Sequence, residues 1–375
     1  MPARSAYENR PYSWIAAACR RWLVARAGST VDPEPLPQPT PDDWTAIEQL
    51  GHQHGVEPLL FAVFARGGDD IDVPEHVRTR WEKAYYGNRI RNEEALTLFA
   101  RLDERCREAG AEILALKGPA AMATVYRDIG LRVIADIDVL CRLGDVVAVA
   151  RAARALGFAG GEVSPHHVAL EYGGAGGGLL ELHFTMHDVV SHRAEFAEAA
   201  WQRRERVAVE DWTLPVMSRE HQVVFDVAHA AHHAFQLDLK HIVDLAGRLM
   251  IERDVLDWSA LQALLSETAL TDAFWRIVRT MERLLQVSFD IPLDRPANAS
   301  VDLEPVTPQS TVAAGVRRSQ GWRAKAVYAW RRLCPPLETL QAGYDLRSRS
   351  QAMAYRPIYV GTELIDLARR WRRGG

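Results

Sequence analysis

Apolar residues follow a helical spacing through most of the first 110 residues. Residues 42–55 and 75–110 predict amphipathic helices, with Thr40 as N-cap, Pro41 at the first helical position and Gly110 as the stop. A shorter apolar stretch near the N-terminus predicts one more helix. Alternating prolines then predict an extended connector, because proline in this density suits neither a helix nor a central strand.

The periodicity changes at residue 111, where short apolar runs alternate with helical segments. The predicted strands are 111–116, 132–140, 166–172 and 179–184, and the predicted helices are 119–128 and 145–157. Asp145 is the candidate cap of the second helix and Gly157 its candidate stop. We therefore expect an α/β unit between helical flanks.

Helical patterns return at 219–250 and 257–286, a loop is expected over 288–315, and basic helices close the chain. The predicted fold class is α+β, with a small mixed sheet and flanking helices between N-terminal and C-terminal helical regions. The predicted segments are 1–39, an N-terminal helix and linker; 40–110, a helical region; 111–215, the sheet-bearing core; and 216–375, a C-terminal helical domain.

The composition is that of a globular protein. The chain has 375 residues, 48% of them hydrophobic and 25% charged, which is enough for two or three packed units. No window is long and uncharged enough for a membrane span. The four cysteines stand singly, without a CxxC pair, so we expect a reducing compartment and a cytoplasmic location.

Charge is unevenly distributed. Residues 316–375 carry a net charge of +9, which leaves −13 for the preceding residues. The simpler interpretation is a C-terminal helix whose last turn carries cations suited to its dipole. The alternative is a basic surface that meets phosphate or nucleic acid.

Asp136 and Asp138 lie two residues apart in an apolar run, so on a strand they project from the same face. Two adjacent carboxylates repel each other, and burying them is costly unless a cation binds. Hard oxygen ligands on a rigid strand suit Mg²⁺. The alternative, two exposed aspartates on an edge strand, is weakened because aspartate is a poor strand former.

Glu181 and His183 repeat this arrangement on a later predicted strand. If the two strands are neighbours, Glu181 becomes the third carboxylate of a site suited to two-metal phosphoryl or nucleotidyl transfer. We expect His183 to orient a ligand or to donate to a phosphate. A core histidine with no role in the site is the alternative.

Lys117 and Gly118 stand between a predicted strand and a helix beginning at Pro119. Glycine allows close approach of a ligand to the backbone, and the helix start and Lys117 both favour anions. An ordinary turn with a surface lysine is the alternative. The combination with the aspartate pair and the later carboxylate predicts a phosphate-binding turn.

Together these motifs resemble the DNA polymerase beta type nucleotidyltransferase superfamily and, more closely, a bacterial family of uncharacterised nucleotidyltransferases. The resemblance covers about residues 40–270, including the segments "HGVEPLL" and "AHHAFQLDLKHIVDL". Its pattern falls on Leu116, Lys117, Gly118, Tyr126, Arg132, Asp136, Asp138, Glu181 and His183. The turn here is Lys-Gly, whereas the wider superfamily usually has Gly-Ser or Gly-Gly.

The resemblance implies a nucleotidyltransferase fold in which Asp136 and Asp138 bind Mg²⁺, with Mn²⁺ as a substitute, and Glu181 completes the cluster. The co-substrate would be an NTP, with ATP preferred. On this basis we expect Arg132 to neutralise charge near the site, on the same strand face as Asp136. Lys240 and Asp244 are expected to face the nucleotide or the acceptor.

Three other motifs admit different functions. The segment "GGAGGG" lacks the Lys-Ser/Thr of a P-loop and is expected to join two strands as a hairpin. His229, His232 and His233 have a spacing able to hold zinc, and with Asp244 they suggest a phosphohydrolase as a minor alternative. Arg80, Arg89 and Arg91 lie among aromatic residues and could bind nucleic acid, but helix packing with snorkelling arginines is commoner.

The sequence therefore predicts a Mg²⁺-dependent transfer of a nucleoside monophosphate to a hydroxyl or phosphate, with release of pyrophosphate. A small molecule or peptide is the preferred acceptor and RNA or tRNA the second, since the overall pI is near 6.4. A kinase-like phosphotransferase and a nucleotide-binding regulatory module are the alternatives.

Overall fold

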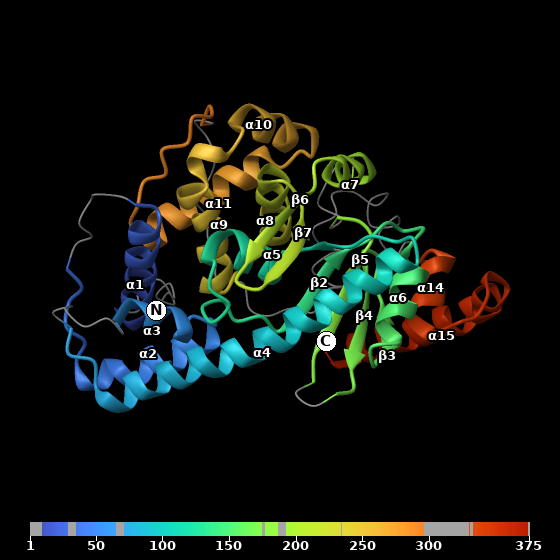
Figure 1. The fold of residues 1–375 in the computed structure, drawn as a ribbon, viewed down its shortest axis with the longest axis horizontal. Coiled ribbons are helices and arrows are strands. Elements are labelled where there is room, and N and C mark those ends of the chain that lie inside the picture. Colours follow the sequence, from blue (N-terminus) through green and yellow to red (C-terminus); the bar gives the residue numbers. More distant parts are fainter. Residues whose placement is uncertain are drawn as a thin grey trace. The chain divides into compact units, whose positions relative to one another are not determined.

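The computed structural model describes residues 10–28, 35–64, 71–174, 177–186, 193–233, 235–295, 330 and 333–373 (Figure 1). These residues form two compact units. The first unit takes in the described residues of the ranges Met1–Thr97, Ala115–Ile134 and Val189–Val306, and the second takes in those of Leu98–Leu114, Ala135–Asp188 and Thr307–Gly375. Each unit is therefore assembled from segments that are distant in sequence.

The described chain contains thirteen α-helices and seven strands, with helices at both ends. The helices are α1 (Arg10–Arg26), α2 (Pro41–Gln53), α3 (Glu57–Phe64), α4 (Glu75–Glu108), α5 (Lys117–Ala121), α6 (Val146–Arg154), α7 (Arg193–Gln202), α8 (Arg219–His232), α9 (Leu239–Ile251), α10 (Trp258–Glu267), α11 (Thr271–Leu285), α14 (Leu337–Tyr344) and α15 (Arg349–Arg373). A π-helical turn (Met122–Tyr126) continues α5, and a 3₁₀ turn (Arg253–Val255) follows α9.

The strands are β1 (Leu114–Ala115), β2 (Asp136–Leu140), β3 (Phe158–Val163), β4 (His167–Tyr172), β5 (Leu179–His183), β6 (Glu205–Val209) and β7 (Trp212–Val216). In the second unit, β2 pairs parallel with β5, and β4 pairs antiparallel with β5 and β3. In the first unit, Ala115 of β1 pairs parallel with β7, and β6 pairs antiparallel with β7. The strands therefore pair in both parallel and antiparallel fashion, which confirms the predicted α+β class with a mixed sheet.

Aromatic residues form the core of the N-terminal helices in the first unit. Trp14 of α1 lies 5.5 Å from Trp44 of α2 and 5.3 Å from Phe64 of α3, measured between ring centroids. Phe64 in turn stacks on Trp81 of α4. All four side chains are buried, so each of these amphipathic helices contributes its apolar face to one cluster.

The predicted helix start at Thr40 is confirmed. Thr40 and Asp43 form a capping box, in which each side chain accepts a hydrogen bond from the other residue's backbone N–H, and Pro41 begins α2. Gly110, in a left-handed conformation, follows α4 as expected. Asp145 immediately precedes α6 as predicted, but its side chain makes no capping hydrogen bond.

In the second unit, α6 and α14 pack against the strands β3, β4 and β5. Gly343 of α14 lies against Val163 and Val168, where a Cβ on the glycine would approach Val163 Cγ2 to 2.4 Å. Val168 pairs with Leu182, which alternates with Glu181 and His183 along β5. Therefore α14 covers the face of the strands opposite to Glu181 and His183.

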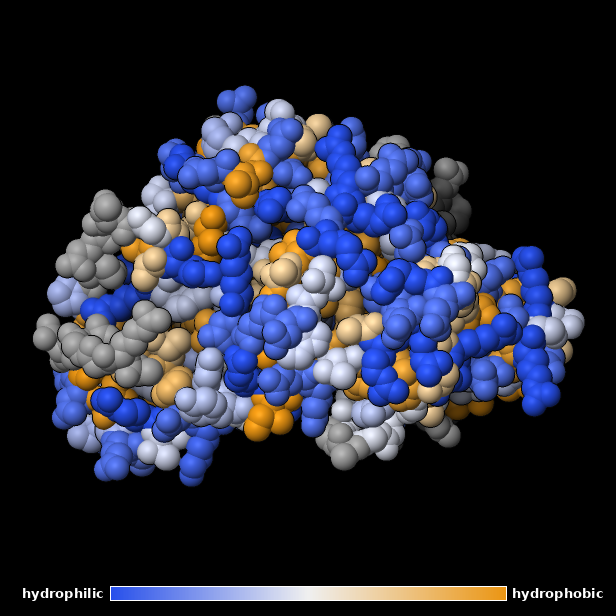
Figure 2. Space-filling model, in the orientation of Figure 1, coloured by the Kyte–Doolittle hydropathy of each residue, from blue (hydrophilic) through white to orange (hydrophobic). Residues whose placement is uncertain are grey.

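The predicted hairpin is confirmed by the antiparallel pairing of β4 and β5, which flank the glycine-rich segment. Residues 175 and 176 of that segment, and residues 296–315 of the predicted loop, lie outside the described part of the chain. Hydrophilic residues cover most of the face in Figure 2, with hydrophobic residues scattered among them. Within the described residues, no helix combines the length and apolar character needed to span a membrane.

The predicted strand 132–140 is too long, because β2 begins only at Asp136. The carbonyl of Arg132 instead accepts hydrogen bonds from the side-chain amides of Asn88 and Asn92, and its guanidinium donates to the carbonyl of Val133. The side-chain amides thus provide the hydrogen bonds that a neighbouring strand would otherwise make with the backbone of Arg132. The expectation that Arg132 shares a strand face with Asp136 is therefore wrong.

Candidate metal centre and phosphate-binding turn

Three carboxylates converge on one face of the strands in the second unit. Asp138 on β2 pairs in register with Glu181 on β5, and Asp136 lies two residues before Asp138. Because side chains alternate along a strand, all three project to the same side. Ligand atoms of Asp136, Asp138 and Glu181 lie within 4.8 Å of one another, so the expected three-carboxylate group is present and could hold a metal ion.

His183 belongs to this group through two short contacts. Its Nε2 atom lies 3.0 Å from Asp138 Oδ1 and 3.1 Å from Glu181 Oε2. The imidazole is buried, with 2% of the side chain exposed. Sequence reasoning placed His183 beside the carboxylates, and the structure brings its ring between two of them.

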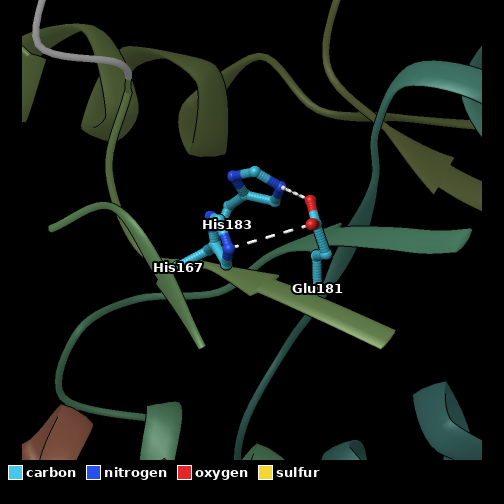
Figure 3. Close-up of side chains that lie close together, drawn as sticks. All are labelled: His167, Glu181 and His183. Carbon is cyan, nitrogen blue, oxygen red and sulfur yellow. Dashed lines mark hydrogen bonds and ion pairs between the residues drawn. The ribbon is translucent and has the colours of Figure 1, made fainter. Parts of the chain in front are cut away.

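His167 is a member of the site that sequence reasoning missed. It begins β4 directly opposite His183 on β5, and its Nε2 atom lies 3.7 Å from Glu181 Oε1. Figure 3 shows both imidazole rings directed at the carboxylate of Glu181. The signal was available, since the glycine-rich hairpin had to bring the first residue of one strand opposite the last residue of the other.

Lys117 in the first unit has a left-handed backbone conformation, with φ at +44°. Such a conformation is unfavourable for a residue with a side chain and marks a position held by its surroundings. The next residue, Gly118, packs so closely that a Cβ would lie 2.5 Å from Ile134 Cγ2. The Lys-Gly turn thus forms the first two residues of α5, which starts two residues before the predicted position at Pro119, and its backbone is strained at Lys117.

Histidines from α8 and α9 lie near this turn. Burial lowers the pKa of His229 well below its usual value, and the positive charge of Lys117 lowers it further. Burial likewise lowers the pKa of His241 to about 4, with a further contribution from the charge of Arg132. Both imidazoles are therefore neutral at physiological pH, with the charge of Lys117 acting on His229 and the charge of Arg132 acting on His241.

Arg132 and Asp244, both candidate site residues, bind each other. Arg132 Nη2 lies 2.6 Å from Asp244 Oδ2, and Arg132 Nε donates to both carboxylate oxygens. Both side chains are buried. Burial also raises the pKa of Tyr126, and the negative charge of Asp244 raises it further, so the phenol stays protonated. The buried ion pair of Arg132 and Asp244 joins the segment before β2 to α9.

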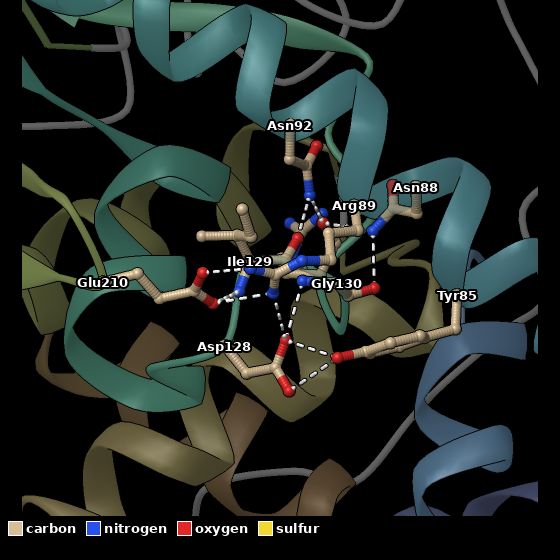
Figure 4. Close-up of polar contacts among 9 residues, drawn as sticks. Tyr85, Asn88, Arg89, Asn92, Asp128, Ile129, Gly130 and Glu210 are labelled. Carbon is tan, nitrogen blue, oxygen red and sulfur yellow. Dashed lines mark hydrogen bonds and ion pairs between the residues drawn. The ribbon is translucent and has the colours of Figure 1, made fainter.

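The turn between the π-helical segment and β2 is held by α4 (Figure 4). Asn92 donates to the carbonyls of Ile129 and Arg132, and Asn88 to those of Gly130 and Arg132. The hydroxyl of Tyr85 lies 3.1 Å from both carboxylate oxygens of Asp128. Arg89 pairs with Glu210, and the carboxylate of Glu210 also accepts a hydrogen bond from the backbone N–H of Ile129. This network fixes the backbone that leads to Arg132.

Two other sequence candidates contact residues of their own unit. Lys240 lies 4.0 Å from Asp238, and its alkyl chain lies against Gly55, where a Cβ would meet Lys240 Cδ at 3.0 Å. Arg80, one of the arginines considered for nucleic-acid binding, pairs with Glu57 of α3 at 2.8 Å. Among the described residues, the groups able to hold a metal do not include His229, His232 or His233, which removes the support for a zinc site on α8.

Comparison with known protein families identifies a nucleotidyltransferase family. The family model described as uncharacterised nucleotidyltransferase matches residues 40–286, which is more than half of the chain. No curated protein matches the sequence. The chain therefore belongs to this nucleotidyltransferase family, as the motif resemblance predicts. Such a family implies an NTP substrate and typically a divalent metal, and the acidic group of Asp136, Asp138 and Glu181 is a candidate for holding it.

Proposed function

We propose that the protein transfers a nucleoside monophosphate from an NTP, with ATP preferred, to a hydroxyl or phosphate of a small-molecule or peptide acceptor. The acceptor oxygen bonds to the α-phosphorus, the bond from the α-phosphorus to the bridging oxygen breaks, and pyrophosphate leaves. The acceptor proton passes to a carboxylate or to solvent. The observation that carries this proposal is the convergence of Asp136, Asp138 and Glu181 in a member of a nucleotidyltransferase family.

The three carboxylates fit Mg²⁺, or Mn²⁺ in its place, because both ions prefer hard oxygen ligands. A bound divalent cation would supply positive charge to the reacting phosphates. Asp136 and Asp138 would hold the ion, and Glu181 would complete the ligand set or accept the acceptor's proton. The contacts of His183 with Asp138 and Glu181 support a role for this imidazole in orienting both carboxylates.

We assign phosphate binding to the Lys-Gly turn. Lys117 contributes a positive charge that attracts an anion, and the buried His229 beside it stays neutral. Gly118 has no side chain to cover the backbone amides. The buried ion pair of Arg132 with Asp244 supports a positioning role for these two residues. For Lys240, a contact with the nucleotide or acceptor stays a prediction.

The decisive experiment compares NTPs labelled on the α-phosphate with NTPs labelled on the γ-phosphate, each incubated with the full-length protein, Mg²⁺ and a cell extract. Transfer of the α-label to an acceptor is expected, and product mass should rise by one nucleoside monophosphate. The variant Asp136→Asn should abolish transfer. Transfer of the γ-label alone would instead identify a phosphotransferase, and nucleotide binding without transfer of either label would identify a regulatory module. An RNA product carrying the α-label would replace the small-molecule or peptide acceptor.

A further inference from the structure

A second group of metal-ligating atoms lies beside the carboxylates. His167, Glu181 and His183 place three ligand atoms within 4.8 Å of one another. Glu181 is common to both groups, with Oε1 directed towards His167 and Oε2 towards His183. This second donor set contains two imidazole nitrogens, whereas the carboxylate group contains only oxygen.

We infer that His167, Glu181 and His183 form a second metal site, which takes a divalent transition metal such as Zn²⁺ rather than Mg²⁺. Imidazole nitrogen suits zinc and its neighbours in the periodic table, whereas Mg²⁺ prefers oxygen ligands. Two histidines and one glutamate are also a known donor set of catalytic zinc sites, which keep a further position open. The inference extends the proposed nucleotidyl transfer without depending on it.

The two distances from Glu181 to the histidines are close to those between ligands of one ion. Four-coordinate zinc with bonds of about 2.0–2.1 Å separates neighbouring ligand atoms by about 3.3–3.4 Å. The His183 Nε2 to Glu181 Oε2 distance is 3.1 Å and the His167 Nε2 to Glu181 Oε1 distance is 3.7 Å, one on each side of that value. These two distances are therefore compatible with ligands of one ion, to which His183 Nε2 would bind in place of its contacts with Asp138 and Glu181.

The backbone holds the two histidines in place. His167 and His183 are directly opposed on the antiparallel strands β4 and β5, so their side chains leave the same face. At the start of β4, the Ser164 hydroxyl donates to the carbonyl of His167 and accepts from its N–H at 3.0 Å. The positions of both rings are thus set by strand register and by this turn.

Burial also favours a metal site. His183 is buried, whereas the side chains of His167 and Glu181 are 19% and 16% exposed, so the group is largely shielded but still reached by solvent. The nearby Asp136 and Asp138 add negative charge that attracts a divalent cation. Glu181 would then be shared between an all-oxygen position and a position with nitrogen ligands.

Binding of Co²⁺ and Zn²⁺ to chelator-treated, full-length protein tests this site in the absence of nucleotide. Co²⁺ should give visible absorption bands characteristic of nitrogen ligation, and Zn²⁺ should displace them. His167→Gln and His183→Gln should each weaken Co²⁺ binding more than about 100-fold, because loss of a direct ligand should exceed the 10–100-fold cost of losing an outer-shell partner. His166→Gln is the matched control, since His166 lies in the same hairpin but outside the ligand group.

The glutamine variants separate metal ligation from hydrogen bonding. Glutamine at position 183 can still donate an N–H to Asp138 and Glu181, but an amide is a poor ligand for zinc. Unfolding midpoints should therefore change little while Co²⁺ affinity falls. Equal Co²⁺ binding by the wild type and the two variants, or wild-type absorption typical of oxygen ligands alone, would overturn the inference. Asp136→Asn should abolish transfer yet leave the nitrogen-type absorption, so failure of either proposal is distinguishable.

Discussion

Asp138 and Glu181 are register partners on the parallel strands β2 and β5, and their carboxylates face the same side. Neither residue lies on a loop. A parallel pair fixes the separation of the two backbones, so the carboxylates are brought together without a bound ion to assemble them. The arrangement is preorganised, at the cost of holding like charges close together.

Removal of these charges should abolish transfer without unfolding the protein. Asp138→Asn and Glu181→Gln keep the size of each side chain but remove the negative charge that binds a metal. We expect initial rates of nucleotide transfer to fall at least about 100-fold, with unfolding midpoints unchanged or raised, because like-charge repulsion is relieved. Glu162→Gln, which alters an exposed carboxylate on β3, should leave the rate unchanged. A variant that keeps more than half of the wild-type rate would remove its residue from the site.

The strained backbone at Lys117 allows its charge to be tested separately from its conformation. Lys117→Gly should relieve about 1–2 kcal/mol of left-handed strain but increase the entropy of the unfolded chain by a similar amount, so the free energy of unfolding should change little. Lys117→Ala retains the strain. Both variants should raise the KM for the NTP about tenfold or more, and Lys117→Arg should restore part of the loss. Unchanged KM values in all three variants would exclude phosphate binding by this side chain.

The elements and carboxylates of the site could be predicted because they leave local patterns in the sequence. Alternation in "DID" and "LELH" placed Asp136, Asp138, Glu181 and His183 on strand faces, and Thr40 with Pro41 located a helix start. The segment "GGAGGG" predicts the hairpin, whose register places His167 opposite His183. The direction of a side chain can thus be predicted from the local sequence wherever the backbone geometry of a strand or helix alone determines it.

Features that depend on distant contacts could not be predicted. The start of β2 is set by amides on α4, about forty residues earlier in the chain, which bind the carbonyl of Arg132. The pairing of Arg132 with Asp244 joins residues 112 positions apart, and nothing in either local sequence specifies it. The left-handed conformation of Lys117 is likewise unusual for lysine, so propensity argues against it.

The amide contacts of Asn92 should be important for stability. Asn92→Ala would leave the buried carbonyls of Ile129 and Arg132 without this donor and would open a small cavity. We expect a loss of about 2–3 kcal/mol in the free energy of unfolding, measured by urea denaturation. Asn92→Asp should cost at least as much, because a carboxylate cannot donate. Lys83→Ala, on an exposed part of α4, should change stability by less than about 0.5 kcal/mol. A similarly small effect of Asn92→Ala would show that water replaces the amide.

The close contact between Gly118 and Ile134 should produce strong coupling. Gly118→Ala would place a Cβ 2.5 Å from Ile134 Cγ2, which requires a backbone or side-chain shift. The single variant should lose about 1–3 kcal/mol of stability. In the double variant with Ile134→Ala, the clash is removed, so the two effects should be clearly less than additive in a double-mutant cycle. Additive losses would indicate that the turn relaxes elsewhere.

The stability of the protein should fall in mild acid, in part because of His221. Burial lowers its pKa to about 4, with a further contribution from the charge of Arg203, against about 6.5 in the unfolded chain. Between these values the unfolded state binds the proton and the folded state does not. The contribution of His221 is therefore complete above pH 6.5 and is lost as the pH falls towards 4, at about 1.4 kcal/mol per pH unit.

His221→Asn removes this titration while keeping a polar atom near the Ser218 hydroxyl, which lies 2.8 Å from His221 Nδ1. The variant should be less stable at pH 7 because a buried ring is lost. Its free energy of unfolding, measured by urea denaturation from pH 7 to pH 4.5, should nevertheless fall less steeply than that of the wild type. His76→Gln, which alters an exposed histidine on α4, should retain the wild-type slope. Parallel slopes for the wild type and His221→Asn would mean that His221 binds its proton equally in the folded and unfolded states.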